Sequence, residues 1–156
     1  MKKIVFTLSI SALSFFCGAQ SNFHQSLKKA VQKNHPEINM DNKLIAFNCW
    51  SVDDQESREA NKSFEKAFSV YENAKLKGGL KGIVVLAINK DNLTSSASIV
   101  FTKDGNTKIV SLKLEDVESM DVNAPSNAVY DSSGNEVYRN LNPSVIYNSI
   151  NRLITR

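Results

Sequence analysis

The sequence contains few of the residues that most often carry catalytic or metal chemistry: two cysteines, two histidines and one tryptophan among 156 residues. Both histidines, His24 and His35, lie far from Cys49 along the chain. A base that could activate this thiol is therefore not indicated, and we expect both histidines to be surface residues. The acidic residues that follow Trp50 also lack histidine ligands nearby, so we predict no metal site and no cofactor.

The N-terminal apolar run is too short to cross a bilayer, but it has the surroundings of a secretory signal. Lys2 and Lys3 precede the apolar residues 4–16, and a small-residue exit ends at Ala19. We predict that residues 1–19 are a signal peptide cleaved after Ala19, so that the protein is periplasmic or secreted. Lipid attachment at Cys17 is the alternative, which the bulky Phe16 disfavours.

An excess of charge of one sign is also missing from the predicted mature chain. Removing Lys2 and Lys3 lowers the number of basic residues from 19 to 17, against 16 acidic ones. The formal net charge falls from +3 to about +1. A balance this close to neutral gives no electrostatic reason to expect binding to nucleic acid or to an anionic membrane. After cleavage, no stable membrane span is expected.

Cleavage also leaves Cys49 as the last cysteine, which excludes an intramolecular disulfide. Cys49 follows the apolar residues 44–47. In such a position a cysteine is most often a small buried hydrophobic residue. The alternative is a reactive thiol, or a thiol that pairs with another protein.

The predicted mature chain, residues 20–156, has the length of one domain and alternates helical and strand patterns. Residues 21–35 predict a helix that Ser21 caps, and residues 43–50 a buried strand. Residues 53–77 predict a long amphipathic helix, capped by Asp53 and ended by Gly78–Gly79. A second buried strand over 81–89 completes a βαβ unit with two parallel strands.

Residues 95–114 allow two interpretations. β-Branched residues are frequent in 98–102 and 107–114, and a turn over 103–106 that contains Asp104–Gly105 separates them, which favours a β-hairpin. A short helix over 95–103 followed by a strand over 109–114 fits equally well. Beyond residue 117, the stretches 127–131 and 136–139 flank a Ser-Ser-Gly-Asn turn and predict an antiparallel hairpin. Asn142 and Pro143 then begin a final amphipathic helix.

This order of elements resembles the thioredoxin-like superfamily, in particular secreted bacterial thiol–disulfide oxidoreductases of the redoxin type. Phe47–Asn48–Cys49–Trp50 looks like the strand that precedes the family's Cys-x-x-Cys, and Ala124–Pro125–Ser126 looks like its cis-proline loop. Residues 131–135 look like its hairpin turn. The resemblance implies an α/β three-layer sandwich, with a mixed central sheet between helices and a cis-proline loop before the C-terminal hairpin and helix. It also favours the helix over 95–103.

The chain differs from this family at the position of the catalytic Cys-x-x-Cys motif. With Trp50 aligned to the family's tryptophan, Ser51–Val52–Asp53–Asp54 stands in place of Cys-x-x-Cys. Dithiol exchange needs one thiolate to attack and a second to resolve the mixed disulfide. Acidic residues at the helix start would also oppose a thiolate there. The resemblance therefore implies the fold without the family's catalytic pair, and Cys49 is the sole catalytic candidate.

Three functions follow from these observations. The first is an exported, non-catalytic module that binds an unidentified envelope or secreted protein or peptide. Its groove would be lined by residues that the resemblance implies: Trp50, Ser51, Val52, Asp53, Ala124, Pro125 and Ser126. The second is a thiol-dependent oxidoreductase or peroxide-reducing enzyme that uses Cys49. The third is a structural component of an envelope assembly.

Overall fold

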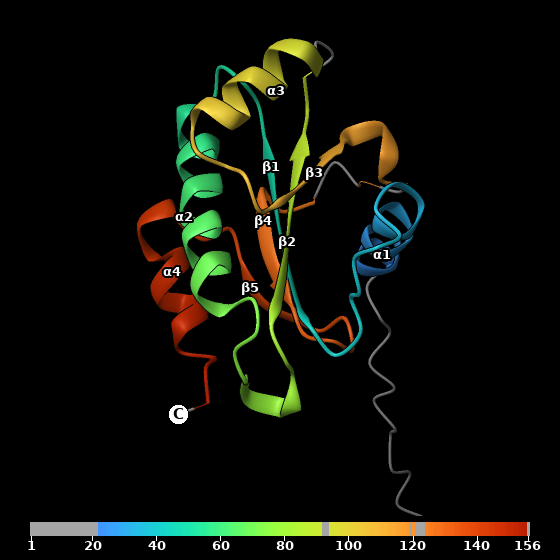
Figure 1. Cartoon of the computed structure of the whole chain (residues 1–156), viewed down its shortest axis with the longest axis vertical. Helices are drawn as coiled ribbons and strands as arrows, with labels where there is room; N and C mark the ends of the chain where they lie inside the picture. Colours follow the sequence, from blue (N-terminus) through green and yellow to red (C-terminus); the bar gives the residue numbers. More distant parts are fainter. Residues whose placement is uncertain (1–21, 92–93, 119, 121–123, 156) are drawn as a thin grey trace, which may run out of the picture.

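A computed structural model of the chain describes residues 22–91, 94–118, 120 and 124–155. Within these residues, one mixed sheet has the strand order β3-β2-β1-β4-β5 (Figure 1). The strands are β1 (Leu44–Trp50), β2 (Ile83–Asn89), β3 (Val110–Lys113), β4 (Asn127–Tyr130) and β5 (Glu136–Arg139). The helices are α1 (Asn22–Asn34), α2 (Gln55–Tyr71), α3 (Thr94–Lys103) and α4 (Pro143–Asn151), with the short 3-10 helices η1 (Lys77–Gly79) and η2 (Leu114–Asp116). The predicted signal peptide and the predicted Ser21 cap lie outside the described residues.

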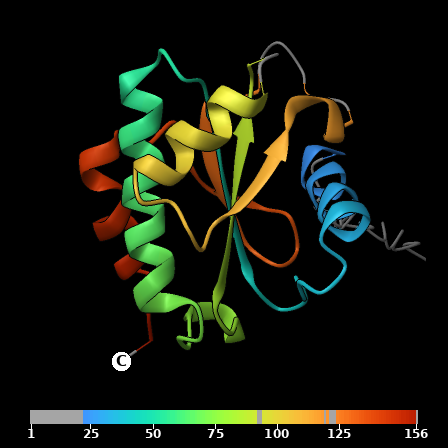
Figure 2. The ribbon, with the colours of Figure 1, turned by 45° about the horizontal axis from the view of Figure 1, so that its top comes forward.

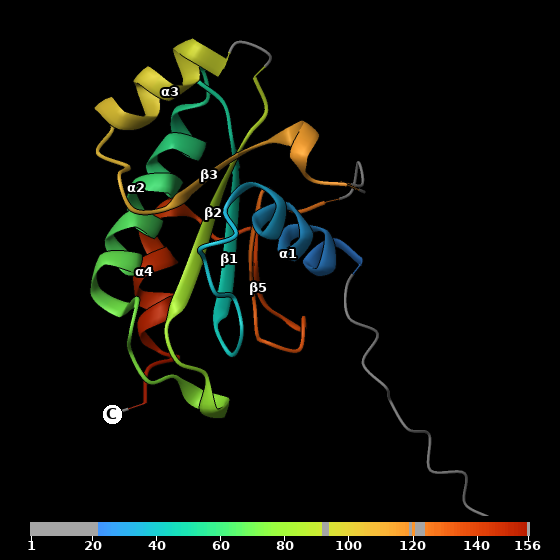
Figure 3. The same cartoon turned by 45° about the vertical axis from the view of Figure 1, so that its right-hand side comes forward.

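The sheet lies between helices, as the resemblance implies. β1 is central, pairs in parallel with β2 and antiparallel with β4, and buries all seven of its residues. Its alternate side chains belong to two separate hydrophobic clusters: one includes residues of α2, α3 and α4, and the other residues of α1. Figure 3 shows α1 on one side of the sheet, with α2 and α4 on the other. A strand covered on both faces explains the continuous apolar run of the sequence.

Helix α2 begins and ends at positions that differ from the prediction. Asp54, not Asp53, is the N-cap, and its carboxylate accepts the backbone N–H of Ser57 at 3.2 Å. The helix ends at Tyr71 rather than near Lys77. Residues beyond Tyr71 form backbone contacts outside a helix, such as the bridge between Leu76 and Ile154. Tertiary pairing of this segment therefore replaces the last helical turns that its composition favours.

Residues 94–113 settle the ambiguity in favour of a helix followed by a strand. α3 precedes β3, and β3 pairs in parallel with β2, with Leu86 opposite Val110. Parallel neighbouring strands need a crossover connection, whereas a hairpin would make its two arms antiparallel. Local β-propensity at Ile99 and Val100 is overridden because the helix can cover one end of the sheet with Ala97 and Phe101.

The C-terminal hairpin and helix agree with the prediction, but the proline loop does not. β4 and β5 pair antiparallel, and Asn142 caps α4 with Pro143 in its first turn. No peptide bond between described residues is cis, so the Ala124–Pro125 bond is trans. The expected cis-proline is thus absent from this loop. Pro125 is nevertheless buried, and the exposed Ser126 follows it directly into β4.

His24 is a second correction, because it lies in the core rather than at the surface. Its side chain is 1% exposed, and its ring lies 5.6 Å from that of Tyr130. His24 shares a helix face with Leu27 and Val31, at spacings of three and seven residues, which the sequence already contained as a signal. A Cβ atom added to Gly134 would lie 2.8 Å from the imidazole Nδ1. The turn between β4 and β5 therefore packs tightly on His24.

Candidate functional site

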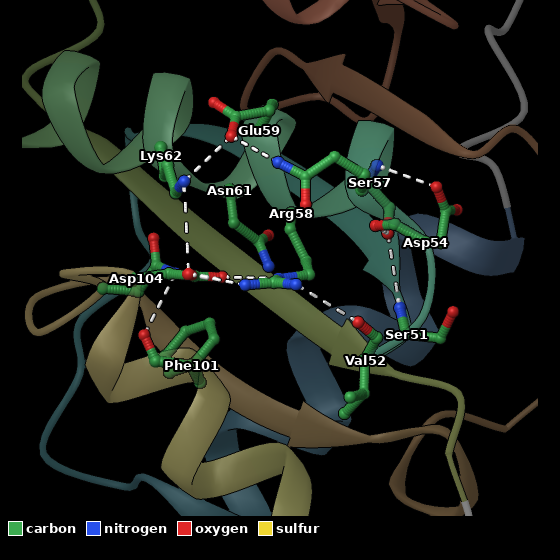
Figure 4. Close-up of polar contacts among 12 residues, drawn as sticks. Ser51, Val52, Asp54, Ser57, Arg58, Glu59, Asn61, Lys62, Phe101 and Asp104 are labelled. Atoms are coloured by element: carbon green, nitrogen blue, oxygen red, sulfur yellow. Dashed lines mark hydrogen bonds and ion pairs between the residues drawn. The ribbon is translucent and has the colours of Figure 1, made fainter.

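The loop between β1 and α2, residues 51–54, is held closed by polar contacts. The Ser51 N–H donates to Ser57 Oγ at 3.3 Å, and the Val52 N–H donates to the Asp91 carboxylate at 2.7 Å. Asp54 supplies the helix cap described above (Figure 4). These bonds satisfy backbone groups at a strand–helix junction, where N–H groups otherwise remain available to a ligand. The junction is built as a fixed turn.

Arg58, in the first turn of α2, also forms hydrogen bonds that hold this loop in place. Its guanidinium donates to both oxygens of Asp104, at 2.7 and 2.8 Å, and to the Val52 carbonyl at 3.4 Å (Figure 4). The hydrogen bond from Arg58, together with its charge, lowers the pKa of the Asp104 carboxyl below its ordinary value. Bidentate pairs of this kind fix geometry as well as charge. The contact links the loop to the end of α3.

Cys49 lies beside this loop, on the opposite face of β1 from Trp50. The residue is 4% exposed and belongs to the cluster that packs against α1. Burial raises the pKa of its thiol to about 12, against a smaller opposing effect from the charge of Lys90. The thiolate is the reactive form of cysteine, so this environment suppresses nucleophilic chemistry. The interpretation of Cys49 as a small buried residue is confirmed.

A cavity of about 370 Å³ opens next to the junction. We call it the junction groove and define it by its lining residues: Asn48, Cys49, Asp54, Glu56, Ser57, Ala60, Lys90, Ser126, Asn127, Asn140, Leu141, Asn142 and Pro143. Five segments meet here: the end of β1, the start of α2, the residue after β2, the entry to β4, and the turn from β5 into α4. The position, between a helix N-terminus and the proline loop, is the one that the resemblance implies.

Most of the predicted groove residues do not line this cavity. Ser126 does, whereas Ser51, Val52, Asp53, Ala124 and Pro125 are not among its lining residues. Trp50 is 1% exposed, stacks on Phe101 with ring centroids 5.3 Å apart, and lines a different cavity. It is therefore a core residue with no place in the junction groove. Its ring packs against Phe101, at the end of α3, and not toward the segments that line the groove.

Sequence reasoning missed the segment 140–143, which closes the far side of the groove. The Asn140 side chain accepts the Ser126 N–H at 2.9 Å and the Ser126 hydroxyl at 3.2 Å. The Ser126 carbonyl accepts the Cys49 N–H at 2.8 Å. Asn140 has a positive φ of 47°, a conformation that asparagine tolerates better than most residues. Asn140 lies between a predicted strand and a predicted helix cap, and this position was the sequence signal for a turn with a positive φ.

Among the described residues, no group of three or more His, Cys, Asp or Glu side chains is placed to hold a metal ion. None of the helices formed by these residues has both the length and the apolar character needed to cross a membrane.

No protein-family model matches the chain, and no curated relative matches it. Solved structures do match. A thiol:disulfide interchange protein from Bacteroides sp. has 17% identity and a TM-score of 0.57, with 72% of this chain and 73% of that chain covered. The thioredoxin domain of a Bacteroides vulgatus thiol-disulfide oxidoreductase has 14% identity and a TM-score of 0.55, covering 74% and 81%. A secreted Mycobacterium tuberculosis disulfide oxidoreductase has 10% identity and a TM-score of 0.53, covering 73% and 84%.

These likenesses establish a thioredoxin-like fold for this chain. At 10–17% identity, the likeness concerns the fold and not the activity of those proteins. The sequence itself shows the difference, because its two cysteines, Cys17 and Cys49, are 32 positions apart by residue number and no Cys-x-x-Cys exists. The chain thus combines the architecture of thiol–disulfide oxidoreductases with a closed, cysteine-free turn after β1.

Proposed function

We propose that this protein is an exported binding module that uses the junction groove to hold a segment of another envelope or secreted protein and performs no thiol chemistry there. The proposal rests on the structure of the turn between β1 and α2 and of the cavity beside it. The turn after β1 is closed by Ser57, Arg58 and Asp91, yet a groove of about 370 Å³ remains beside it. The junction groove therefore lies beside a turn that contains no cysteine.

The alternative that uses Cys49 as a nucleophile is not favoured. With a pKa of about 12, roughly one Cys49 thiol in ten thousand is ionised at pH 8. The side chain is also 4% exposed, so a substrate disulfide or peroxide would have to displace core contacts to reach it. Cys49 is among the lining residues of the junction groove, but its side chain belongs to the cluster that includes residues of α1.

The groove favours recognition through side chains rather than through backbone pairing. Both backbone groups of Ser126 are already bonded, to Asn140 and to Cys49. The charged groups of the lining are the carboxylates of Asp54 and Glu56 and the ammonium group of Lys90. We therefore expect a short peptide segment with hydrogen-bonding or basic side chains facing α2. Backbone addition to a sheet edge, which is common in peptide recognition, is not the expected mode.

Selection from a random peptide library displayed on phage tests this binding function. Peptides enriched on residues 20–156 should lose most of their binding to Ser126→Phe, which fills the groove at an exposed position, and to Glu56→Lys, which reverses a charge on its wall. Ser133→Phe, at an exposed position in the turn between β4 and β5, is the matched control and should bind normally. Failure to enrich any peptide, or equal binding to all variants, would refute the proposed groove.

Export is the second part of the proposal and rests on the signal-like residues 1–19. Its support from the comparisons is limited to one similar structure that is described as secreted. Expression of the full chain in a Gram-negative host, followed by fractionation and mass measurement, tests it directly. A periplasmic product that begins at Gln20 is expected. A cytoplasmic product that retains Met1–Ala19 would contradict export and would leave the groove test unaffected.

A further inference from the structure

Within the connection between α2 and β2, residues 75–81 are rich in lysine and include no acidic residue. We call this segment the basic loop. Its two arms meet in an antiparallel bridge between Lys75 and Lys81, and the Leu76 N–H donates to the Leu80 carbonyl at 2.9 Å. Leu76 and Leu80 are buried in the cluster that includes residues of α2, α3 and α4. The two leucines therefore fix the loop to the core.

The lysines of the basic loop lie on its solvent side. Lys75, Lys77 and Lys81 flank the buried leucines in sequence, and all three are exposed. Because Lys75 and Lys81 are bridge partners, their side chains lie on the same face of the loop. The Lys43 ammonium donates to the Lys81 carbonyl at 3.4 Å and brings a fourth positive charge next to the loop. Figure 2 shows the connection from α2 to β2 at the end of the domain opposite α3, as does Figure 1.

These four positive charges are not neutralised by the part of the chain that the structure describes. None of the ion pairs between described residues involves any of the four lysines. Glu72, the acidic residue nearest to the basic loop in sequence, accepts the side-chain amide of Asn73 at 3.2 Å. Asp53, Asp54 and Glu56 lie at the other end of α2. The near-neutral total charge of the predicted mature chain therefore hides an uncompensated positive end, where facing lysines also repel each other.

We infer that the basic loop, together with Lys43, docks the protein onto the anionic headgroups of a phospholipid bilayer. The surface potential of such a bilayer attracts each lysine that comes near it, and this attraction needs no groove. The tip of the loop, Gly78–Gly79, is open, because a Cβ atom added to either glycine would meet nothing within 4 Å apart from its chain neighbours. Lysines are point charges, which suit an array of headgroups better than the paired geometry that binds one phosphate. The junction groove lies at the opposite end of β1 and stays accessible to a second partner.

Sedimentation of residues 20–156 with phospholipid vesicles tests this docking. In about 50 mM salt, the protein should bind vesicles of phosphatidylcholine with about 30% phosphatidylglycerol about tenfold more tightly than vesicles of phosphatidylcholine alone. Because salt screens exposed charges, the affinity for the anionic vesicles should fall about tenfold when the salt is raised to about 300 mM. An affinity for anionic vesicles no higher than for neutral ones would overturn the inference. Binding to soluble polyglutamate in that case would point to an acidic protein partner instead.

Two double variants separate the effect of the basic loop from that of total charge. Lys75→Gln/Lys81→Gln removes two exposed ammonium groups of the loop, and binding to the anionic vesicles should weaken about 25-fold, or about fivefold for each lysine. Lys29→Gln/Lys33→Gln removes the same charge from exposed positions on α1 and should weaken binding less than about threefold, because charges outside the contact are screened. Equal losses in the two double variants would assign the binding to net charge and would overturn the inference.

Discussion

The two faces of β1 carry neighbouring residues with opposite surroundings. Trp50 faces α2 and α3, where it belongs to the cluster that also includes residues of α4. Cys49 faces α1, in the other cluster. On the Trp50 face, a buried polar network joins Asn48 to α2, and Tyr71 of α2 bonds to Tyr147 and Asn151 of α4. On the Cys49 face, a single helix covers the sheet and buries a histidine.

The two faces should therefore respond differently to changes of pH. The face covered by α2 and α4 is fixed by packing and by hydrogen bonds whose groups do not titrate near neutral pH. The face covered by α1 depends on a neutral imidazole and on a thiol kept protonated by burial. Stability on the first face should therefore depend on volume and hydrogen bonding, and on the second face partly on pH.

Removal of a large side chain from the α2 face should have the largest effect. Phe64 is 0% exposed in the cluster under α2. Phe64→Ala should lower the free energy of unfolding by about 3–5 kcal/mol, because it leaves a cavity in a well-packed core. Val70→Ala on the same helix, at 56% exposure, should change it by less than about 0.5 kcal/mol. Urea denaturation measures both, and comparable effects would contradict the placement of the core.

The polar network on the same face should be the next most sensitive feature. Asn48 Nδ2 donates at 2.8 Å to both the Ser57 carbonyl and Asn61 Oδ1. Asn48→Ala removes the donor to the buried Asn61 Oδ1 and a hydrogen bond to the Ser57 carbonyl, and should lower the free energy of unfolding by about 1–3 kcal/mol. In a double-mutant cycle with Asn61→Ala, the loss of stability in the double variant should be smaller than the sum of the losses in the two single variants. Strict additivity would show that the two side chains do not interact.

On the α1 face, acid should destabilise the protein through His24. Burial lowers the pKa of His24 below its ordinary value, the charge of Lys28 acts in the same direction, and Asp131 opposes them. The unfolded chain therefore binds a proton near pH 6.5 that the folded chain resists, so stability is full above this pH and falls as the pH drops toward the folded pKa. The slope should be less than about 1.4 kcal/mol per pH unit.

Chemical denaturation between pH 5 and 8 tests this dependence. His24→Gln should flatten the fall in stability over this range, whereas His35→Gln, at the partly exposed end of α1, should keep it. An unchanged slope in His24→Gln would assign the pH dependence to other groups. Because α1 carries the histidine, hydrogen exchange of its amides should rise at acidic pH more than exchange in α2.

Cys49 should give the smallest change in stability, together with a clear difference in reactivity. Its thiol has a pKa of about 12 and is 4% exposed, so a thiol reagent should label it in urea and scarcely at all in the native protein. Cys49→Ala should cost about 1 kcal/mol or less in free energy of unfolding. Neither wild type nor Cys49→Ala should reduce insulin. Fast native labelling, or insulin reduction that disappears in Cys49→Ala, would instead support an enzyme.

Several features of the fold could be predicted from residues close together in sequence. The cap at Asn142 and Pro143, the turn before Glu136 and the two buried strands depend on local chemistry and on hydrophobic period. Helix α3 could not be chosen on local grounds, because Ile99 and Val100 favour a strand. It was favoured by the resemblance and is required by the parallel pairing of β2 and β3.

The candidate site was harder to predict than the fold. Ser126 lines the junction groove, but its neighbours there, Asn140 and Asn142, come from a segment that tertiary contacts bring to the groove. The resemblance implied a groove position for Trp50, whereas its side chain lies in the core cluster that includes residues of α2, α3 and α4. The proline loop was expected to be cis, and Pro125 is trans.

Residues 51–54 contain no cysteine, so the sequence alone excludes a Cys-x-x-Cys motif in the turn after β1. Outside residues 95–114, patterns among neighbouring residues also indicated the order of helices and strands. The environments of Cys49, His24 and Trp50 follow from the tertiary structure. Burial, a shifted pKa and an unpaired indole N–H depend on which distant segments pack around each side chain, and no local pattern contains that information.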